Sequence, residues 1–463
     1  MNAYETKNSF GLKLKENFQN FIYSTYFPLA VAFFTVFIYF TKMQLAGAFT
    51  FCLFAMIVLI IQKDMSPLIP PLFNVVFLFS DLSVFNNPLS FIVFVPLIIG
   101  FIVHLVKYPI KKVKFGLYGI SLIVMFLSLV LGGVLTKEYL SYFAPSESWF
   151  GEGLSLMIGV GLGMIVEYFI LKNGLYNEER KDFNLKIYFS YTLVFTAIGV
   201  AIQLLIMRAL NYPRDFGWGN INFCGYVFML AVPSAIYLMI KTKHIFTYSA
   251  IILALFFVTY VSGSDGALGT MLMFTPLMLI YAYFKLDKKQ KQIFFNTYMS
   301  TIIIGLILVI AVIIYDGSKV NTIIKHIVDH FFNDTGRTPL YKMAIDAFKE
   351  NAIFGLGIFY PIKYTLGKPI LVNYHSSIFN TLATTGLFGM VALIFNYFAR
   401  AKILMKNNSL FNSCAFFAVA MYIAYSSVDH GEVTMLLILV TGILAVTEKL
   451  NASEKSKLKP LLN

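Results

Sequence analysis

Long runs of hydrophobic residues, separated by short polar segments, recur along the whole chain. A helix needs roughly 17–25 mostly apolar residues to cross a bilayer, and fourteen runs approach or reach that length. They lie near residues 25–41, 44–62, 67–80, 88–106, 116–135, 153–171, 187–207, 223–240, 245–261, 268–284, 294–315, 376–398, 410–427 and 433–447. None alternates with the period of two expected of a membrane β-barrel. The pattern predicts an all-α fold, with residues 1–463 forming a single integral membrane domain, a polytopic helix bundle of 12–14 transmembrane helices. The predicted number extends below fourteen because three of the runs are short for a spanning helix.

The composition agrees with a membrane protein and excludes three other classes. Of the 463 residues, 58% are hydrophobic and 13% are charged, whereas a soluble domain has about 45–50% apolar and about 25% charged residues. A soluble fold would therefore have too little polar surface, and a disordered chain needs the opposite balance. Cys52, Cys224 and Cys414 are isolated within apolar runs, which excludes a disulfide scaffold.

The net charge of +13 would suggest nucleic acid as a partner of a soluble protein, but in a membrane protein basic residues first report orientation. With the amino terminus inside, 25 of the 36 Lys and Arg residues fall in inside segments and 11 fall outside. Seven of those 11 lie in one long loop, residues 316–375. The short loops thus follow the positive-inside rule, which predicts that both termini are cytoplasmic. Because orientation accounts for most of the basic residues, we expect no nucleic acid as a partner.

The long external loop, residues 316–375, has a pattern of its own. Apolar residues from Val320 to Phe331 recur at the spacing of an amphipathic helix. A second amphipathic helix is expected from Thr338, as its N-cap, with Pro339 at the first helical position. Two such helices on the outer face suggest a roofed cavity rather than a simple connection.

Four short motifs follow one another from this loop into the next hydrophobic run. They are Arg337, Gly355-Leu-Gly357, Asn373-Tyr374-His375 and Gly386-Leu-Phe-Gly389. In this order and at these distances they resemble the signature region of the O-antigen ligase and O-antigen polymerase superfamily of bacterial membrane glycosyltransferases. Upstream, Ser264-Asp265-Gly266 is similar to the family's Ser-Arg-Gly element, although Asp265 stands where the family usually has arginine. The resemblance covers residues 210–395.

The resemblance implies transfer of a glycan from a polyprenyl-diphosphate carrier, of the undecaprenyl type, to an acceptor hydroxyl at the external face of the bacterial plasma membrane. It implies an inverting reaction without cofactor or metal, whose partners are the lipid-linked donor, a glycan or lipid-glycan acceptor, and membrane lipids. Arg337 and His375 are the expected catalytic residues, because guanidinium binds phosphate oxygens in pairs and histidine suits a general base. Arg208, Arg214 and Tyr374 are the expected substrate-binding residues, and either arginine could replace the charge missing at Asp265.

Each of these residues also has a simpler interpretation. Arg337 could cap its helix or reach toward lipid headgroups, and His375 could cap the next helix beside Ser376. Arg208 and Arg214 could be anchors at the membrane interface. Two polar clusters could bind metal, but a solvated helix face is favoured for His326 with His330, and a polar turn for residues 429–432.

A transporter or flippase of lipid-linked glycans is the alternative function, since a bundle of this size also suits a transporter. Two features of the sequence count against it. The two halves show no repeat in span length or loop pattern, and the polar groups gather at one face rather than at the midplane. Ligase and polymerase share the implied fold and differ only in acceptor, so both remain open at this stage.

Overall fold

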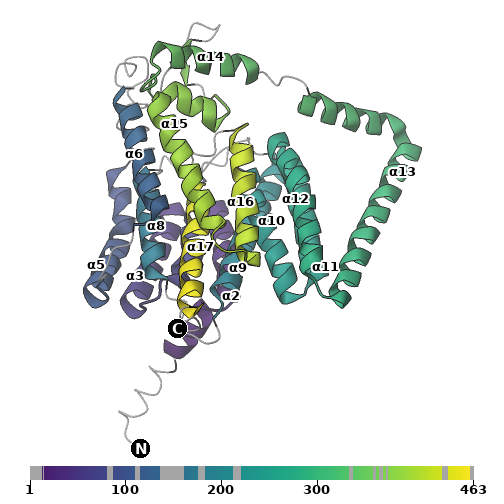
Figure 1. The fold of residues 1–463 in the computed structure, drawn as a ribbon. Helices are drawn as coiled ribbons and strands as arrows, with labels where there is room; N and C mark the ends of the chain where they lie inside the picture. Colours follow the sequence, from purple (N-terminus) through teal and green to yellow (C-terminus); the bar gives the residue numbers. More distant parts are fainter. Residues whose placement is uncertain are drawn as a thin grey trace, which may run out of the picture. The chain divides into compact units, whose positions relative to one another are not determined.

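The structure is a computed structural model that describes residues 13, 15–80, 87–109, 115–135, 161–175, 183–211, 221–332, 337–357, 361–363, 369–371, 374–429 and 436–458. These residues are almost entirely helical, with one small hairpin (Figure 1). In chain order the elements are α2 Tyr26–Thr41, α3 Gln44–Ile61, η1 Ser66–Leu68, α4 Ile69–Asn74, η2 Val75–Leu78, η4 Pro88–Phe94, α5 Val95–Lys107, α6 Leu117–Leu135, α8 Gly163–Gly174, α9 Leu185–Ala209, α10 Phe223–Thr242, α11 Ile245–Ser262, α12 Asp265–Lys285, α13 Lys288–Phe332, α14 Arg337–Glu350, β1 Pro361–Lys363, β2 Pro369–Leu371, α15 Ser377–Leu404, α16 Leu410–Ser426 and α17 Leu437–Leu458.

The described part of every predicted hydrophobic run is mainly helical, which confirms the all-α membrane bundle. Within the described residues, seven helices are long and apolar enough to span a membrane, or eight if the bent pair Lys15–Ile22 and Tyr26–Thr41 is one span. Three shorter apolar helices, Ser66–Leu78, Leu117–Gly132 and Leu410–Ser426, fall below that length. The count of 12–14 spans stays a prediction, because parts of several runs lie outside the described residues.

The chain divides into two compact units, of which the first comprises Met1–Lys114 and Ile170–Val227. In it α2 packs against α9, and α3 packs against α5. Its core is built from large apolar side chains, among them Phe27, Val31, Phe51 and Leu59. Burial of such side chains contributes roughly 1.5–3 kcal/mol each in water. Within a bilayer the close packing of these side chains takes over much of that role.

The proline-containing run of the first unit forms the short helices η1, α4 and η2 instead of one span. Two buried side-chain amides donate hydrogen bonds to backbone carbonyls of this run. The Asn74 side chain donates to the carbonyl of Pro70 at 2.9 Å and to the Thr196 hydroxyl at 2.9 Å. The Gln203 side chain donates to the carbonyl of Phe77 at 3.0 Å. A broken helix is tolerated at membrane depth only where its freed backbone groups are satisfied in this way.

The second unit, Phe115–Phe169 with Phe228–Asn463, is organised around α15. This helix packs along α6, α14, α16 and α17, while α12 packs against α16 (Figure 1). A cluster of asparagines joins the ends of α15, α16 and α17. The Asn451 side chain accepts from the amides of Asn407 and Asn412, at 2.9 Å and 3.0 Å, and donates to the carbonyl of Ile403 at 2.9 Å. Helices α15 and α16 are thereby fixed to one another at the ends opposite the site described below.

The region after α12 departs from the predicted elements in three ways. Helix α13 runs without a break from Lys288 to Phe332, so the first amphipathic segment continues the preceding span. Helix α14 begins at Arg337, so Thr338 lies inside the first turn and is not the N-cap. Pro339 is tolerated there because first-turn N–H groups have no partner within the helix. Strands β1 and β2 were not predicted and form an antiparallel hairpin that pairs Ile362 with Ile370.

Candidate active site

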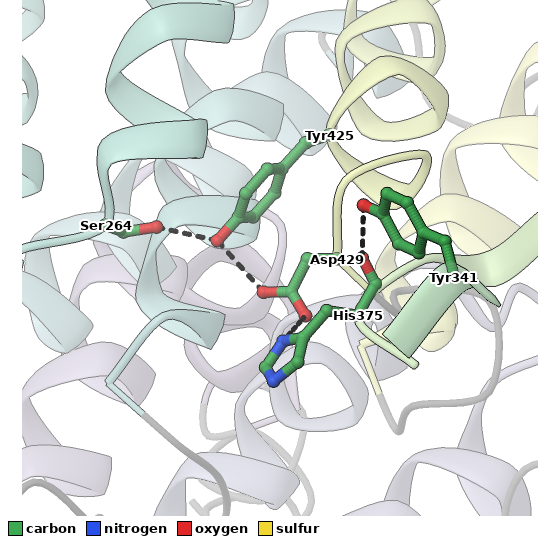
Figure 2. Close-up of polar contacts among 5 residues, drawn as sticks. All are labelled: Ser264, Tyr341, His375, Tyr425 and Asp429. Carbon is green, nitrogen blue, oxygen red and sulfur yellow. Dashed lines mark hydrogen bonds and ion pairs between the residues drawn. The ribbon is translucent and has the colours of Figure 1, made fainter. Parts of the chain in front are cut away.

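Four helix ends of the second unit meet around His375: the starts of α12, α14 and α15 and the end of α16. Figure 2 shows the polar contacts that join them, made by Ser264, Tyr341, His375, Tyr425 and Asp429. Helix termini carry backbone groups without intrahelical partners, so polar side chains collect there at little cost. The residues therefore form one connected polar cluster, although they come from distant parts of the sequence.

His375 immediately precedes α15 and is held in an unusual backbone conformation. Its φ of 46° lies in the left-handed region, which few residues other than glycine adopt. Ser376, the N-cap of α15, accepts from the N–H of Phe379. The Tyr341 hydroxyl donates to the His375 carbonyl at 3.5 Å, and the Tyr341 ring stacks on Phe379 with centroids 4.3 Å apart. Strained backbone of this kind is concentrated at functional sites.

The imidazole of His375 faces a buried carboxylate, that of Asp429. Nδ1 of His375 lies 3.8 Å from Oδ1 of Asp429, which is an ion-pair distance and too long for a hydrogen bond. The His375 side chain is 44% exposed and that of Asp429 only 5%. A substrate can thus reach the histidine, while the aspartate is held behind it.

A hydrogen-bonded chain extends from Asp429 to the start of α12. The Tyr425 hydroxyl donates to Oδ2 of Asp429 at 3.2 Å and lies 2.6 Å from the Ser264 hydroxyl oxygen. The backbone N–H of Asp429 also donates to the carbonyl of Tyr425 at 2.9 Å. Both the backbone and the carboxylate of Asp429 are therefore held by the last turn of α16.

Arg337 is brought to the same cluster. It is the first residue of α14, one turn before Tyr341, and is partly exposed. One turn later on the same helix, the Tyr341 hydroxyl donates to the His375 carbonyl at 3.5 Å, which joins the start of α14 to the cluster. The two predicted catalytic residues, Arg337 and His375, thus border one cluster.

The Ser264-Asp265-Gly266 element, singled out in the sequence, forms one side of this cluster. Ser264 contributes its hydroxyl to Tyr425, and its backbone N–H donates to the Ser262 hydroxyl at 3.2 Å. A Cβ on Gly266 would lie 2.8 Å from the Tyr425 ring. Glycine is therefore needed here so that α12 can approach α16.

The two glycine motifs, Gly355-Leu-Gly357 and Gly386-Leu-Phe-Gly389, lie in segments that exchange backbone hydrogen bonds. Gly386 breaks α15, with φ 61° and ψ −152°. The carbonyls of Ala383 and Thr384, on one side of this break, accept from the N–H groups of Leu356 and Gly357 at 2.8 Å and 3.0 Å. In return, the N–H groups of Leu387 and Phe388 donate to the carbonyls of Ala352 and Ile353 at 2.9 Å and 3.1 Å. Gly355-Leu-Gly357 thus completes the broken turn of α15 and fixes α14, with Arg337, against it.

Replacing Gly355 by alanine is expected to destabilise this connection. Gly355 has φ 69°, and a Cβ there would lie 2.5 Å from backbone atoms of Thr384 and Thr385. The strained backbone alone costs about 1–3 kcal/mol, so the melting temperature of purified Gly355→Ala should fall clearly. Gly305→Ala in α13 is the matched control, because a Cβ there meets nothing within 4 Å. Equal melting temperatures for the two variants would contradict this account.

The predicted substrate-binding residues fall in three different places. Tyr374 is 1% exposed and lies in a small core with Ala344, Ala347 and other apolar residues, so its ring packs α14 onto α15. Arg208 is exposed near the end of α9, in the first unit. Arg214 lies outside the described residues. The substrate-binding roles of all three stay predictions.

Two suggested metal clusters are only partly visible. Within the described residues, no three His, Cys, Asp or Glu side chains are grouped to hold a metal ion. The side chains of His326 and His330, and residues 430–432, lie outside that description. Asp429, first interpreted as part of a polar turn, contacts His375 instead.

The sequence did not identify three members of the cluster. These are Tyr341, Tyr425 and, in its role as the partner of His375, Asp429. Tyr425 and Asp429 are four residues apart at the end of an apolar helix, and residues at that spacing share a helix face. A polar pair at such a position was the available signal. Its link to His375 depends on the packing of α16 beside α15, which the sequence alone does not reveal.

These observations define a polytopic helical membrane protein with a polar site where helix ends meet. The family model described as O-antigen ligase matches residues 249–394, from α11 into α15. This match confirms that residues 249–394 resemble the O-antigen ligase and polymerase superfamily. It includes Ser264, Arg337 and His375 and ends before Tyr425 and Asp429. No curated protein matches the chain.

Proposed function

We propose that the protein transfers a glycan from a polyprenyl-diphosphate carrier to an acceptor hydroxyl, with His375 as the base. The observation that carries the proposal is the His375–Asp429 pair, joined through Tyr341 to the start of α14 that bears Arg337, in a region that matches the O-antigen ligase family model. A base that is reachable from solvent, next to a cation able to bind phosphate, is the combination that this reaction needs.

In the proposed reaction the acceptor oxygen attacks the anomeric carbon of the donor sugar. The bond from that carbon to the diphosphate oxygen breaks, and the leaving diphosphate keeps the electron pair. His375 takes the proton of the acceptor hydroxyl. A single displacement of this kind inverts the anomeric configuration and requires neither cofactor nor metal. Because the His375 side chain is 44% exposed, a hydroxyl can approach its ring.

Asp429 stabilises the imidazolium that forms when His375 takes this proton. An opposite charge within about 4–6 Å favours the charged form of a titrating group, and the two side chains are 3.8 Å apart. The effect is strengthened by burial of Asp429, because its surroundings screen charge less than water does.

Arg337 binds the diphosphate and stabilises the negative charge that develops as it leaves. Guanidinium presents two parallel N–H groups to two phosphate oxygens in a planar, paired geometry that the ammonium of lysine lacks. Asp265 cannot supply the second cation expected from the Ser-Arg-Gly pattern, so we propose Arg208 or Arg214 for that role. Tyr374 contributes to the substrate site through the position it gives His375, its neighbour in the chain.

We place this site on the external face of the bacterial plasma membrane, with both termini in the cytoplasm. The distribution of lysine and arginine over the short loops supports this orientation. Donor, acceptor and surrounding lipids are then the partners, and no nucleic acid is involved.

Purified protein in liposomes, given a polyprenyl-diphosphate oligosaccharide, tests the proposed function. We expect glycosidic bond formation, and the products separate the two subclasses. A ladder of lengthened glycans identifies a polymerase, and one transfer to a different acceptor lipid identifies a ligase. Movement of intact donor across the bilayer without bond formation would replace the proposal with a flippase.

A further inference from the structure

We infer that Tyr425 and Ser264 are positioning residues, which hold the Asp429 carboxylate toward His375 through one directed chain of hydrogen bonds. The inference rests on the proposed function and extends it to two side chains that do not touch the substrate. The chain joins the start of α12 to the end of α16 (Figure 2).

The direction of the chain follows from the chemistry of its end. An ionised carboxylate only accepts hydrogen bonds, so the Tyr425 hydroxyl gives its single hydrogen to Oδ2 of Asp429, 3.2 Å away. The Tyr425 oxygen can then only accept from Ser264, at 2.6 Å. Ser264 is therefore the donor, and each bond in the series polarises the next.

Burial explains why Asp429 needs this chain. Its side chain is 5% exposed, and a buried carboxylate is costly unless it is hydrogen-bonded. With Oδ2 bound by Tyr425, Oδ1 is the oxygen that faces Nδ1 of His375 at 3.8 Å. Without the phenol, the carboxylate loses the hydrogen bond to Oδ2 that helps to keep Oδ1 toward the histidine.

The surroundings of the Tyr425 ring fix its place as well. Gly266 leaves room for the ring, since a Cβ there would lie 2.8 Å from it. The Ser262 hydroxyl accepts from the N–H of Ser264 at 3.2 Å and donates to the carbonyl of Thr259 at 2.6 Å. The last turn of α11 thus holds Ser264, the first donor of the chain, in place.

The kinetics of Tyr425→Phe, Ser264→Ala and the double variant test the inference. A hydrogen bond contributes about 0.5–1.5 kcal/mol net, so each single variant should lower kcat by about 3- to 10-fold, with KM for the lipid-linked donor unchanged. Because both changes interrupt one chain, the double variant should be no slower than Tyr425→Phe. Tyr422→Phe, a buried tyrosine of the same helix that packs against Arg400, is the matched control and should keep full activity.

The outcomes separate this inference from the proposed function. Multiplied losses in the double variant, or full activity of Tyr425→Phe while His375→Ala is inactive, would overturn the chain and leave the reaction intact. Full activity of His375→Ala would overturn the proposed function itself. If Tyr425→Phe does not accumulate in the membrane, Ser264→Ala decides alone, because it leaves the Tyr425 ring in place. Unchanged kcat in Ser264→Ala then rejects the inference.

Discussion

His375→Ala is expected to lower glycan transfer by about 10²- to 10⁴-fold, the usual contribution of a positioned base. The acceptor proton then has no side chain to receive it, while Asp429 stays buried without the imidazole that faces it. Initial rates with saturating donor and acceptor measure the effect, and KM for the donor should change little because His375 acts on the acceptor.

The control for this variant is His244→Ala. His244 is exposed between α10 and α11, so its loss should leave both the transfer rate and the membrane content unchanged. Equal rates for the two histidine variants would remove His375 from the site. A low rate accompanied by loss of protein from the membrane would show a folding defect instead, which the amount of purified protein reveals.

Arg337→Ala is expected to lower transfer by about 10²- to 10³-fold, the usual cost of removing one group that stabilises developing charge. Arg337→Lys should recover only part of the rate, because ammonium does not bind two phosphate oxygens in the planar, paired geometry of guanidinium. The measurement is the rate of single turnover with donor bound, together with donor affinity.

Lys342→Ala is the matched control for Arg337, since it removes a positive charge from an exposed position of the same helix. If the positive charges of α14 acted only by attraction to anionic lipid, both variants would lose turnover equally. Specific binding of the diphosphate predicts that only Arg337→Ala loses turnover.

The sequence predicts the helices well because hydrophobic length is what a bilayer demands of a spanning segment. The runs at 187–207 and 376–398 show this, as they are recognisable without any knowledge of their neighbours and fall on α9 and α15. The sequence predicts the boundary between a span and an amphipathic helix less well. Asp316-Gly317 favours a turn directly after the predicted span, yet α13 continues through it to Phe332.

Part of the candidate site was also predictable. Arg337 and His375 stand in a recognisable order with their glycines, and in the structure Tyr341 joins the start of α14, which bears Arg337, to His375. Asp429 as a partner of His375 was not predictable, because their contact arises from the packing of helices distant in the chain. The sequence also does not show why glycine is required at Gly355 and Gly386, because the hydrogen bonds exchanged between the two segments exist only once α15 is broken.

The central claim is that the His375–Asp429 pair and Arg337 couple glycosyl transfer to the release of the carrier diphosphate. Single-turnover reaction of purified protein with donor labelled in both the lipid and the glycan tests it most directly. The account predicts one polyprenyl diphosphate released for each glycosidic bond formed, with both products lost together in His375→Ala. Release of polyprenyl diphosphate at the wild-type rate in His375→Ala, or bond formation without release, would contradict it.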